Sequence, residues 1–317
     1  MHKMQTPKLR ERSMIKTVAI LGAGAIGSYF INGLSDKLDE GLWVVAEGER
    51  AERLCRDGIV MNGRRFELNV RTPEEARGAD LLIIALKYGA LRPALSQIES
   101  VVDERTIVLC PMNGVDKEQI VDGCIGEGRT LPSLMKMAVL RVKGGFTYDP
   151  EVARGVFLGE ADGSRSERVV ALEELFDGTP IVYHVSEHII EDIWYKFALN
   201  VSRNLPQAIL NCGFGAYAAS EHVAYLSQRL RDEVVAVAAA QGIDISGPNP
   251  VGVNSNQPPY ARFSTLQDLD AGRPTEIDMF SGTVIRMGRE FGVPTPYNDF
   301  AYHAIKALEE KNAGVFA

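Results

Sequence analysis

The sequence Thr17-Val-Ala-Ile-Leu-Gly-Ala-Gly-Ala-Ile-Gly27 joins a continuous apolar run to a glycine triplet. An apolar run with no polar face is typical of a strand buried on both sides in a parallel sheet. Gly22 permits a tight turn, Gly24 has no Cβ to obstruct a pyrophosphate, and Gly27 lets the following helix lie close to the strand. The first amides of that helix would point at the phosphates. We therefore predict a dinucleotide site whose binding residues here are Gly22, Gly24, Ala25, Ile26 and Gly27.

The next elements along the chain support a cofactor site. Residues 28–34 have helical periodicity, and a second apolar run ends at an acid, Glu47, twenty residues after Gly27. A carboxylate at the end of this strand accepts hydrogen bonds from free ribose hydroxyls and repels a 2′-phosphate, which favours NAD over NADP. Arg50 and Arg53 are close enough in the sequence to bind a phosphate instead. Glycine triplets also occur in ordinary loops, but this context favours the functional interpretation.

Composition indicates a soluble globular protein of 317 residues, which suffices for two domains with their own cores. A formal net charge of −8 argues against nucleic acid and anionic membranes as partners, and no apolar run approaches the length of a bilayer span. The leader, residues 1–13, is polar and basic, which predicts a disordered extension and not a secretory signal. The four cysteines have no C-x-x-C spacing, which indicates reduced thiols in a cytoplasmic protein; they are Cys55, Cys110, Cys124 and Cys212.

Apolar runs alternate with helical segments over residues 14–187. The runs at 42–46, 80–86 and 106–110 are nearly continuous, which predicts a parallel, doubly wound sheet of the Rossmann type. Shorter strands within 135–160 are expected at one edge of this sheet. The sequence therefore predicts an α/β fold, with a dinucleotide-binding domain over 14–187.

The second half of the chain, residues 188–317, has a different pattern. Helical periodicity dominates it, which predicts an all-α domain for substrate binding and dimerisation. The first helix is expected to start with a serine cap at Ser186, and the others to cover 220–241, 276–291 and 298–311. Ligands of doubly wound sheets bind beyond the carboxyl ends of the strands, so the active site is expected between the two domains. The sequence leaves open whether the protein is a monomer or a homodimer.

Three polar side chains share one face of the first predicted helix. Helical spacing aligns Lys196, Asn200 and Asn204 in an otherwise apolar and aromatic segment. A cation followed by two amides can hold a polar, anionic substrate, and a partly desolvated lysine can donate a proton near neutral pH. A lysine that reaches solvent beside two surface asparagines explains the same spacing.

A second polar cluster begins at Ser264. Its segment Arg273-Pro-Thr-Glu276 is interpreted as a loop into a helix, with Glu276 in the first turn, where its charge suits the helix dipole. Simple capping with solvated charges is the alternative. Elsewhere, His184-Val-Ser-Glu187-His188 matches the H-x-x-E-H pattern of a zinc-protease motif. His184 is expected to precede the helix, so no metal site is predicted.

From about residue 15 onward the chain resembles the ketopantoate reductase (2-dehydropantoate 2-reductase) family. Several motifs occur in the order of that family over about 260 residues, which is more specific than any one of them. The matching elements are the glycine triplet, Lys87, Asn113-Gly114, Trp194-x-Lys196-x-x-x-Asn200-x-x-x-Asn204, and Ser264-x-Leu-Gln-Asp268 followed by Gly272-Arg-Pro-Thr-Glu276-Ile-Asp278.

The resemblance implies NAD(P)H-dependent reduction of a small 2-oxo acid, 2-dehydropantoate, to pantoate in the synthesis of pantothenate and coenzyme A. It implies that Lys196 is the general acid and that Glu276 accepts a hydrogen bond from the substrate hydroxyl. Reduction of a 2-oxo acid develops an alkoxide, which needs a nearby proton and fixed donors, so the chemistry of these residues agrees. The resemblance assigns substrate binding to Asn113, Asn200, Asn204 and Ser264, and cofactor contacts to Lys87, Asn113 and Glu276.

Two positions depart from the family pattern. The family usually has an arginine for the NADP 2′-phosphate where this chain has Glu47, so the resemblance predicts NADPH and the residue itself favours NADH. Met112 stands where the family often has a polar residue, which would affect substrate choice. Two alternatives remain: a reductase of another branched 2-oxo acid with the same catalytic residues, and a catalytically silent dinucleotide sensor. Intact Lys196 and Glu276 argue against the sensor.

Overall fold

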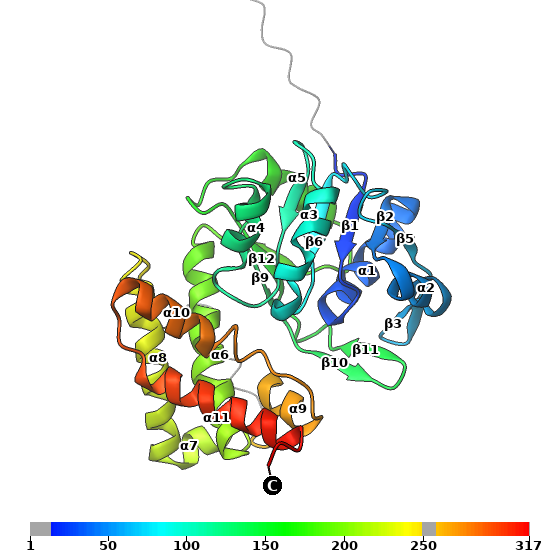
Figure 1. Ribbon diagram of the computed structural model, residues 1–317. Helices are drawn as coiled ribbons and strands as arrows, with labels where there is room; N and C mark the ends of the chain where they lie inside the picture. Colours follow the sequence, from blue (N-terminus) through cyan, green and yellow to red (C-terminus); the bar gives the residue numbers. More distant parts are fainter. Residues whose placement is uncertain (1–13, 249–257, 317) are drawn as a thin grey trace, which may run out of the picture.

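A six-stranded parallel sheet forms the centre of the first half of the chain (Figure 1). The computed structural model describes residues 14–248 and 258–316, so the predicted leader 1–13 lies outside the described residues. The strand order is β5-β2-β1-β6-β7-β8, and the direction of winding reverses between β1 and β6. The strands are β1 (Val18–Leu21), β2 (Leu42–Val45), β5 (Asn69–Arg71), β6 (Leu81–Ile84), β7 (Ile107–Leu109) and β8 (Thr130–Leu131).

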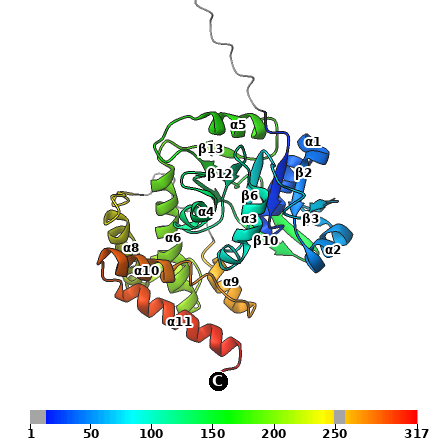
Figure 2. The same cartoon turned by 45° about the horizontal axis from the view of Figure 1, so that its top comes forward.

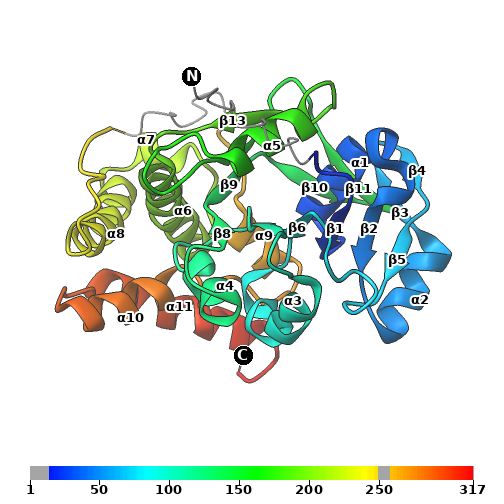
Figure 3. The same ribbon diagram turned by 90° about the horizontal axis from the view of Figure 1, so that it is seen from above.

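Helices cover both faces of this sheet, which explains its continuous apolar strands (Figure 3). All of β1 is buried: Val18 and Ile20 contribute to one core, and Ala19 and Leu21 to the other. Because side chains alternate along a strand, a strand covered on both faces needs apolar residues at every position. The predicted doubly wound α/β fold is confirmed. The helices are α1 (Ala25–Leu38), α2 (Gly48–Asp57) and α5 (Glu167–Phe176) on the first core, and α3 (Leu95–Val101) and α4 (Lys117–Ile125) on the second.

Strands between residues 133 and 185 belong to two further sheets, so the prediction that the strands within 135–160 extend one edge of the parallel sheet is wrong. The hairpin β10 (Val139–Val142) and β11 (Gly145–Tyr148) pairs with β3 (Ile59–Met61), which pairs in turn with β4 (Arg64–Phe66). In the other sheet, β12 (Gly155–Leu158) lies between β9 (Ser133–Lys136) and β13 (Tyr183–Val185). A short apolar run specifies a strand but not its partner, and β3 comes long before β11 in the chain.

The described part of the second half is helical, as predicted (Figure 2). Helices α6 and α8 pack against each other, with Val201 and Val234 in their shared core. The first helix begins at Ile189 and not with a cap at Ser186, whose hydroxyl donates to Asp192 and accepts from the His188 N–H. Within residues 14–248 and 258–316, no helix is both long and apolar enough to cross a bilayer. The helices are α6 (Ile189–Leu210), α7 (Ala216–Ala219), α8 (Glu221–Ala239), α9 (Ser264–Asp270), α10 (Ser281–Phe291) and α11 (Pro296–Asn312).

Candidate active site

The glycine triplet forms the turn between β1 and α1, and its three members do different things. Gly22 has φ +107°, and a Cβ there would lie 2.6 Å from the Ala85 carbonyl oxygen. A Cβ on Gly27 would lie 1.8 Å from the Gly22 carbonyl oxygen. A Cβ on Gly24, by contrast, would meet nothing within 4 Å, and α1 starts at the next residue, Ala25. The turn therefore leaves open space before the amides of a helix N-terminus, which fits a pyrophosphate.

Glu47 lies two residues after the end of β2, at the N-cap position of α2, and its side chain is exposed. Its Oε2 accepts a hydrogen bond of 2.8 Å from Gln97 Nε2 on α3. Arg50 and Arg53 both lie on α2 and are exposed. The structure thus keeps a carboxylate, oriented by Gln97, at the end of the second strand, where the ribose of a dinucleotide lies in this fold class.

Lys196 is half-buried and faces the first half of the chain. Its Nζ donates a hydrogen bond of 2.8 Å to Asn113 Oδ1, in the loop after β7. Lys196, Asn113 and Asn200 together line a small cavity at this junction. The remaining residues of the cavity wall are Met112, Gly114, Leu134, Ile193 and Phe197. The alternative of a solvated lysine among surface asparagines is therefore wrong for Lys196.

The surroundings of Lys196 make it a weaker base than a free lysine. Burial is the largest cause, and it lowers the pKa of Lys196 to about 7, with Lys117 and Lys136 acting in the same direction and Glu276 opposing them. A group with a pKa near 7 can both hold and release a proton near neutral pH. These surroundings suit a proton donor.

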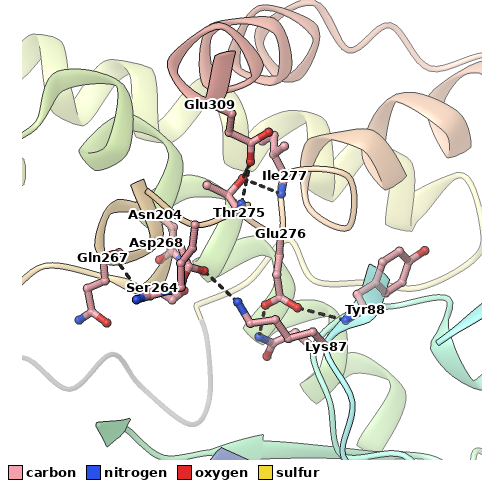
Figure 4. Close-up of polar contacts among 12 residues, drawn as sticks. Lys87, Tyr88, Asn204, Ser264, Gln267, Asp268, Thr275, Glu276, Ile277 and Glu309 are labelled. Atoms are coloured by element: carbon pink, nitrogen blue, oxygen red, sulfur yellow. Dashed lines mark hydrogen bonds and ion pairs between the residues drawn. The ribbon is translucent and has the colours of Figure 1, made fainter. Parts of the chain in front are cut away.

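Glu276 reaches from the helical domain to the parallel sheet (Figure 4). Its carboxylate accepts hydrogen bonds from the Tyr88 N–H and from Asn113 Nδ2, each 3.3 Å long. The prediction that Glu276 lies in the first turn of a helix is wrong, because α10 begins only at Ser281. Thr275 is bound through its N–H and hydroxyl to Glu309 of α11, 2.7 Å in each case, and residues 276–280 form turns. These bonds hold Thr275 against α11, directly before the residue that reaches the loops of the sheet.

Asn113 connects the two expected catalytic residues. An amide can accept at its oxygen and donate at its nitrogen, and here the oxygen accepts from Lys196 while the nitrogen donates to Glu276. Lys87 and Asn113 follow β6 and β7, so both lie at the carboxyl ends of parallel strands. In a doubly wound sheet this is the edge at which ligands bind.

Lys87, Asn204 and Ser264 lie in a neighbouring set of polar contacts (Figure 4). Lys87 Nζ lies 3.3 Å from Asp268 Oδ2, and Asn204 Nδ2 donates to Ser264 Oγ at 3.3 Å. Asp268 Oδ1 in turn accepts from Arg273 Nε at 2.8 Å. The sequence prediction missed Asp268 as a site residue, although it stands within the motif that starts at Ser264. It also missed Gln97, for which the sequence carries no signal beyond its place on a helix.

The two histidines of the H-x-x-E-H pattern, His184 and His188, do not lie on one helix. His184 lies in β13 and stacks on Phe157, with ring centroids 4.5 Å apart, and His188 directly precedes α6. His184 therefore precedes the helix, as expected. Among the residues that the structure describes, no group of three or more His, Cys, Asp or Glu side chains is placed to hold a metal ion.

The glycine turn after β1 fits a dinucleotide, and α6 presents the half-buried Lys196 to the loop after β7. This arrangement is typical of an oxidoreductase that uses a nicotinamide dinucleotide. Residues 18–149 match the family model described as ketopantoate reductase PanE/ApbA, and residues 188–309 match that of its C terminal. The chain belongs to the ketopantoate reductase PanE/ApbA family, as its motifs predict.

Individual relatives extend over nearly the whole chain. A 2-dehydropantoate 2-reductase of Mesorhizobium japonicum is 29% identical, and the match covers 92% of this chain and 97% of the relative. A PanE/ApbA family ketopantoate reductase from Ralstonia eutropha JMP134 has a TM-score of 0.79 at 22% identity, covering 94% of this chain and 99% of that one. D-Mandelate dehydrogenase, in its ternary structure with NADH and anilino(oxo)acetate, has a TM-score of 0.81 at 23% identity. The match covers 94% of this chain and 99% of that one. These structures share the fold of this chain.

Proposed function

We propose that this chain reduces 2-dehydropantoate to pantoate, the reductive step in pantothenate and coenzyme A synthesis. The observation that carries the proposal is the Lys196 ammonium, buried at the carboxyl edge of the sheet and 2.8 Å from Asn113 Oδ1. The name of the Mesorhizobium japonicum relative, 2-dehydropantoate 2-reductase, supports the choice of substrate. We also assign the cofactor to the glycine turn, Glu47 and Lys87.

In this mechanism each side chain has a defined task. The glycine turn, Glu47 and Lys87 would hold a reduced nicotinamide dinucleotide, which would supply the hydride. As negative charge develops on the keto oxygen of the substrate, Lys196 Nζ donates a proton to it, and Asn113 holds the ammonium in place. Asn200, Asn204 and Ser264 donate hydrogen bonds to the polar ends of the substrate. Glu276 accepts a hydrogen bond from the substrate hydroxyl.

A second candidate is reduction of a different 2-oxo acid by the same residues. The fold shared with D-mandelate dehydrogenase, solved with NADH and anilino(oxo)acetate, favours this candidate, as does Met112 in the wall of the cavity. A silent dinucleotide sensor is disfavoured, because a buried lysine has no use in a protein that only binds a cofactor. Steady-state reduction of 2-dehydropantoate and of aliphatic and aromatic 2-oxo acids, each with NADH and NADPH, tests all three. The highest kcat/KM on another acid would replace the proposed substrate, and turnover of none would favour the sensor.

Glu47 sets the choice of cofactor in this proposal. We expect the protein to use NADH at least as well as NADPH, because a carboxylate accepts hydrogen bonds from ribose hydroxyls and repels a 2′-phosphate. Glu47→Arg should shift the ratio of kcat/KM values towards NADPH about tenfold or more, since one charge-assisted hydrogen bond is worth that much. Glu49→Arg, with the same change of charge on the same exposed helix, is the matched control. A clear NADPH preference of the unmodified protein would show that Arg50 and Arg53 dominate.

In this proposal Glu276 recognises the substrate by accepting a hydrogen bond from its hydroxyl. We expect Glu276→Gln to lower kcat/KM on 2-dehydropantoate about tenfold more than on an analogue that lacks the hydroxyl, since a site built for a hydrogen bond penalises its loss. Glu290→Gln, an exposed position on α10, controls for the loss of one charge. Equal losses on both substrates would mean that Glu276 acts only through Tyr88 and Asn113.

A further inference from the structure

Three lysines interact electrostatically at the cavity wall that carries the proposed proton donor. Lys196 lines the cavity itself. Lys117, three residues after the cavity residue Gly114, is fully buried and forms an ion pair of 2.6 Å with Glu118. Lys136 is the third, and its Nζ is buried with no hydrogen-bond partner among the residues that the structure describes. Holding several like charges partly away from water costs free energy.

The position of Lys136 follows from its strand. Lys136 and Leu134 are two residues apart on β9, so their side chains leave the same face of that strand, and Leu134 is part of the cavity wall. Strand β9 packs against α6, where Asp192 stands one helical turn before Lys196 and interacts electrostatically with Lys136. The Lys136 ammonium lies 4.7 Å from the centroid of the Phe157 ring. Lys136 thus stands behind the cavity wall, against the helix face that carries Lys196.

We propose that Lys136, together with Lys117, is a positioning residue for proton transfer, whose positive charge repels the Lys196 ammonium and makes Lys196 the stronger proton donor. This inference rests on the proposed function, because it assigns a role in the same reaction. Lys136 does not line the cavity, so it acts through Lys196 and not on the substrate.

Charged groups around Lys136 and Lys196 raise or lower the pKa of each lysine. Burial lowers the pKa of Lys136 to about 8, with Arg154 acting in the same direction and Asp192 opposing. Burial lowers the pKa of both lysines, and Asp192 favours the charged form of Lys136. Glu276, from the turn before α10, acts against the repulsion at Lys196. Asp192, Glu276 and the Glu118 carboxylate paired with Lys117 therefore limit the effect, while Lys136 has no hydrogen-bonded counterion in the described part of the chain.

The test is Lys136→Met, which removes the charge and keeps an apolar chain of similar length. We expect the pKa of Lys196 to rise by about one pH unit, as expected for one charge in a protein interior. Competitive labelling of amines with acetic anhydride across a pH series, followed by peptide mass spectrometry, measures this pKa without turnover. In steady-state assays the fall of kcat at high pH, where the donor is deprotonated, should move upward by the same amount.

Two further variants make the result specific. Lys136→Arg keeps the charge and should leave the labelling profile of Lys196 as in the unmodified protein. Lys143→Met removes an exposed charge from the turn between β10 and β11 and should also leave it unchanged. Should Lys136→Met fail to fold, Lys136→Gln carries the same expectation. An unchanged Lys196 profile in the folded neutral variant would overturn the inference. Because the labelling needs no substrate, a protein that reduces no 2-oxo acid would overturn only the proposed function.

Discussion

Lys196→Ala is expected to lower kcat for reduction of the 2-oxo acid about 10²- to 10⁴-fold, the usual contribution of a positioned general acid. The physical reason is that the keto oxygen gains negative charge as hydride arrives, and Lys196 Nζ is placed to neutralise it. Asn113, which accepts from that Nζ at 2.8 Å, has no proton of similar acidity to offer in its place. Steady-state kinetics on the best substrate of the 2-oxo acid panel measures the loss.

The controls for Lys196→Ala separate catalysis from binding and folding. The Kd for NADH should change little, because the glycine turn and Glu47 lie on the parallel sheet and not on α6. Lys311→Ala, an exposed lysine in the last turn of α11, should retain full activity. The high-pH fall of kcat should disappear from the residual activity of Lys196→Ala. A Lys196→Ala protein with nearly the kcat of the unmodified chain on every substrate would rule out Lys196 as the proton donor.

The sequence predicts the parallel sheet of this protein well, because strands that are buried on both faces are apolar at every position. Every residue of β1 and β6 is apolar, and each such run ends where a loop of the candidate site begins. The spacing of Lys196 and Asn200 is equally direct, since one helix carries both into the same cavity wall. These features depend on neighbours that are close in the chain, so the sequence contains them.

Contacts between distant parts of the chain are less predictable. Glu276 contacts Asn113 from a segment in which Thr275 is bound to Glu309, and neither the Thr275–Glu309 contact nor the turn that follows it has a local sequence pattern. Lys136 looks like an ordinary polar residue of a short strand, and its importance arises from Asp192 and Lys196 on α6. Charge clusters of this kind depend on the tertiary fold, and composition or periodicity does not report them.

Substitutions in the glycine turn are expected to have a second large effect, and Gly27→Ala and Gly24→Ala form a matched pair of variants. We expect Gly27→Ala to lower the free energy of unfolding by about 3 kcal/mol, because its Cβ would lie 1.8 Å from the Gly22 carbonyl oxygen and the backbone must move. The displaced turn should also lose measurable NADH binding. Guanidinium unfolding and a fluorescence titration with NADH measure the two effects.

Gly24→Ala should separate these two effects. Its Cβ would meet nothing within 4 Å in the protein, so we expect the free energy of unfolding to change by less than about 1 kcal/mol. A pyrophosphate over the turn would meet that methyl group, and overpacking of this size should weaken NADH binding about tenfold or more. A Gly24→Ala protein that binds NADH as tightly as the unmodified chain would place the pyrophosphate elsewhere. A Gly27→Ala protein of unchanged stability would show that the β1–α1 turn can open without disturbing the sheet.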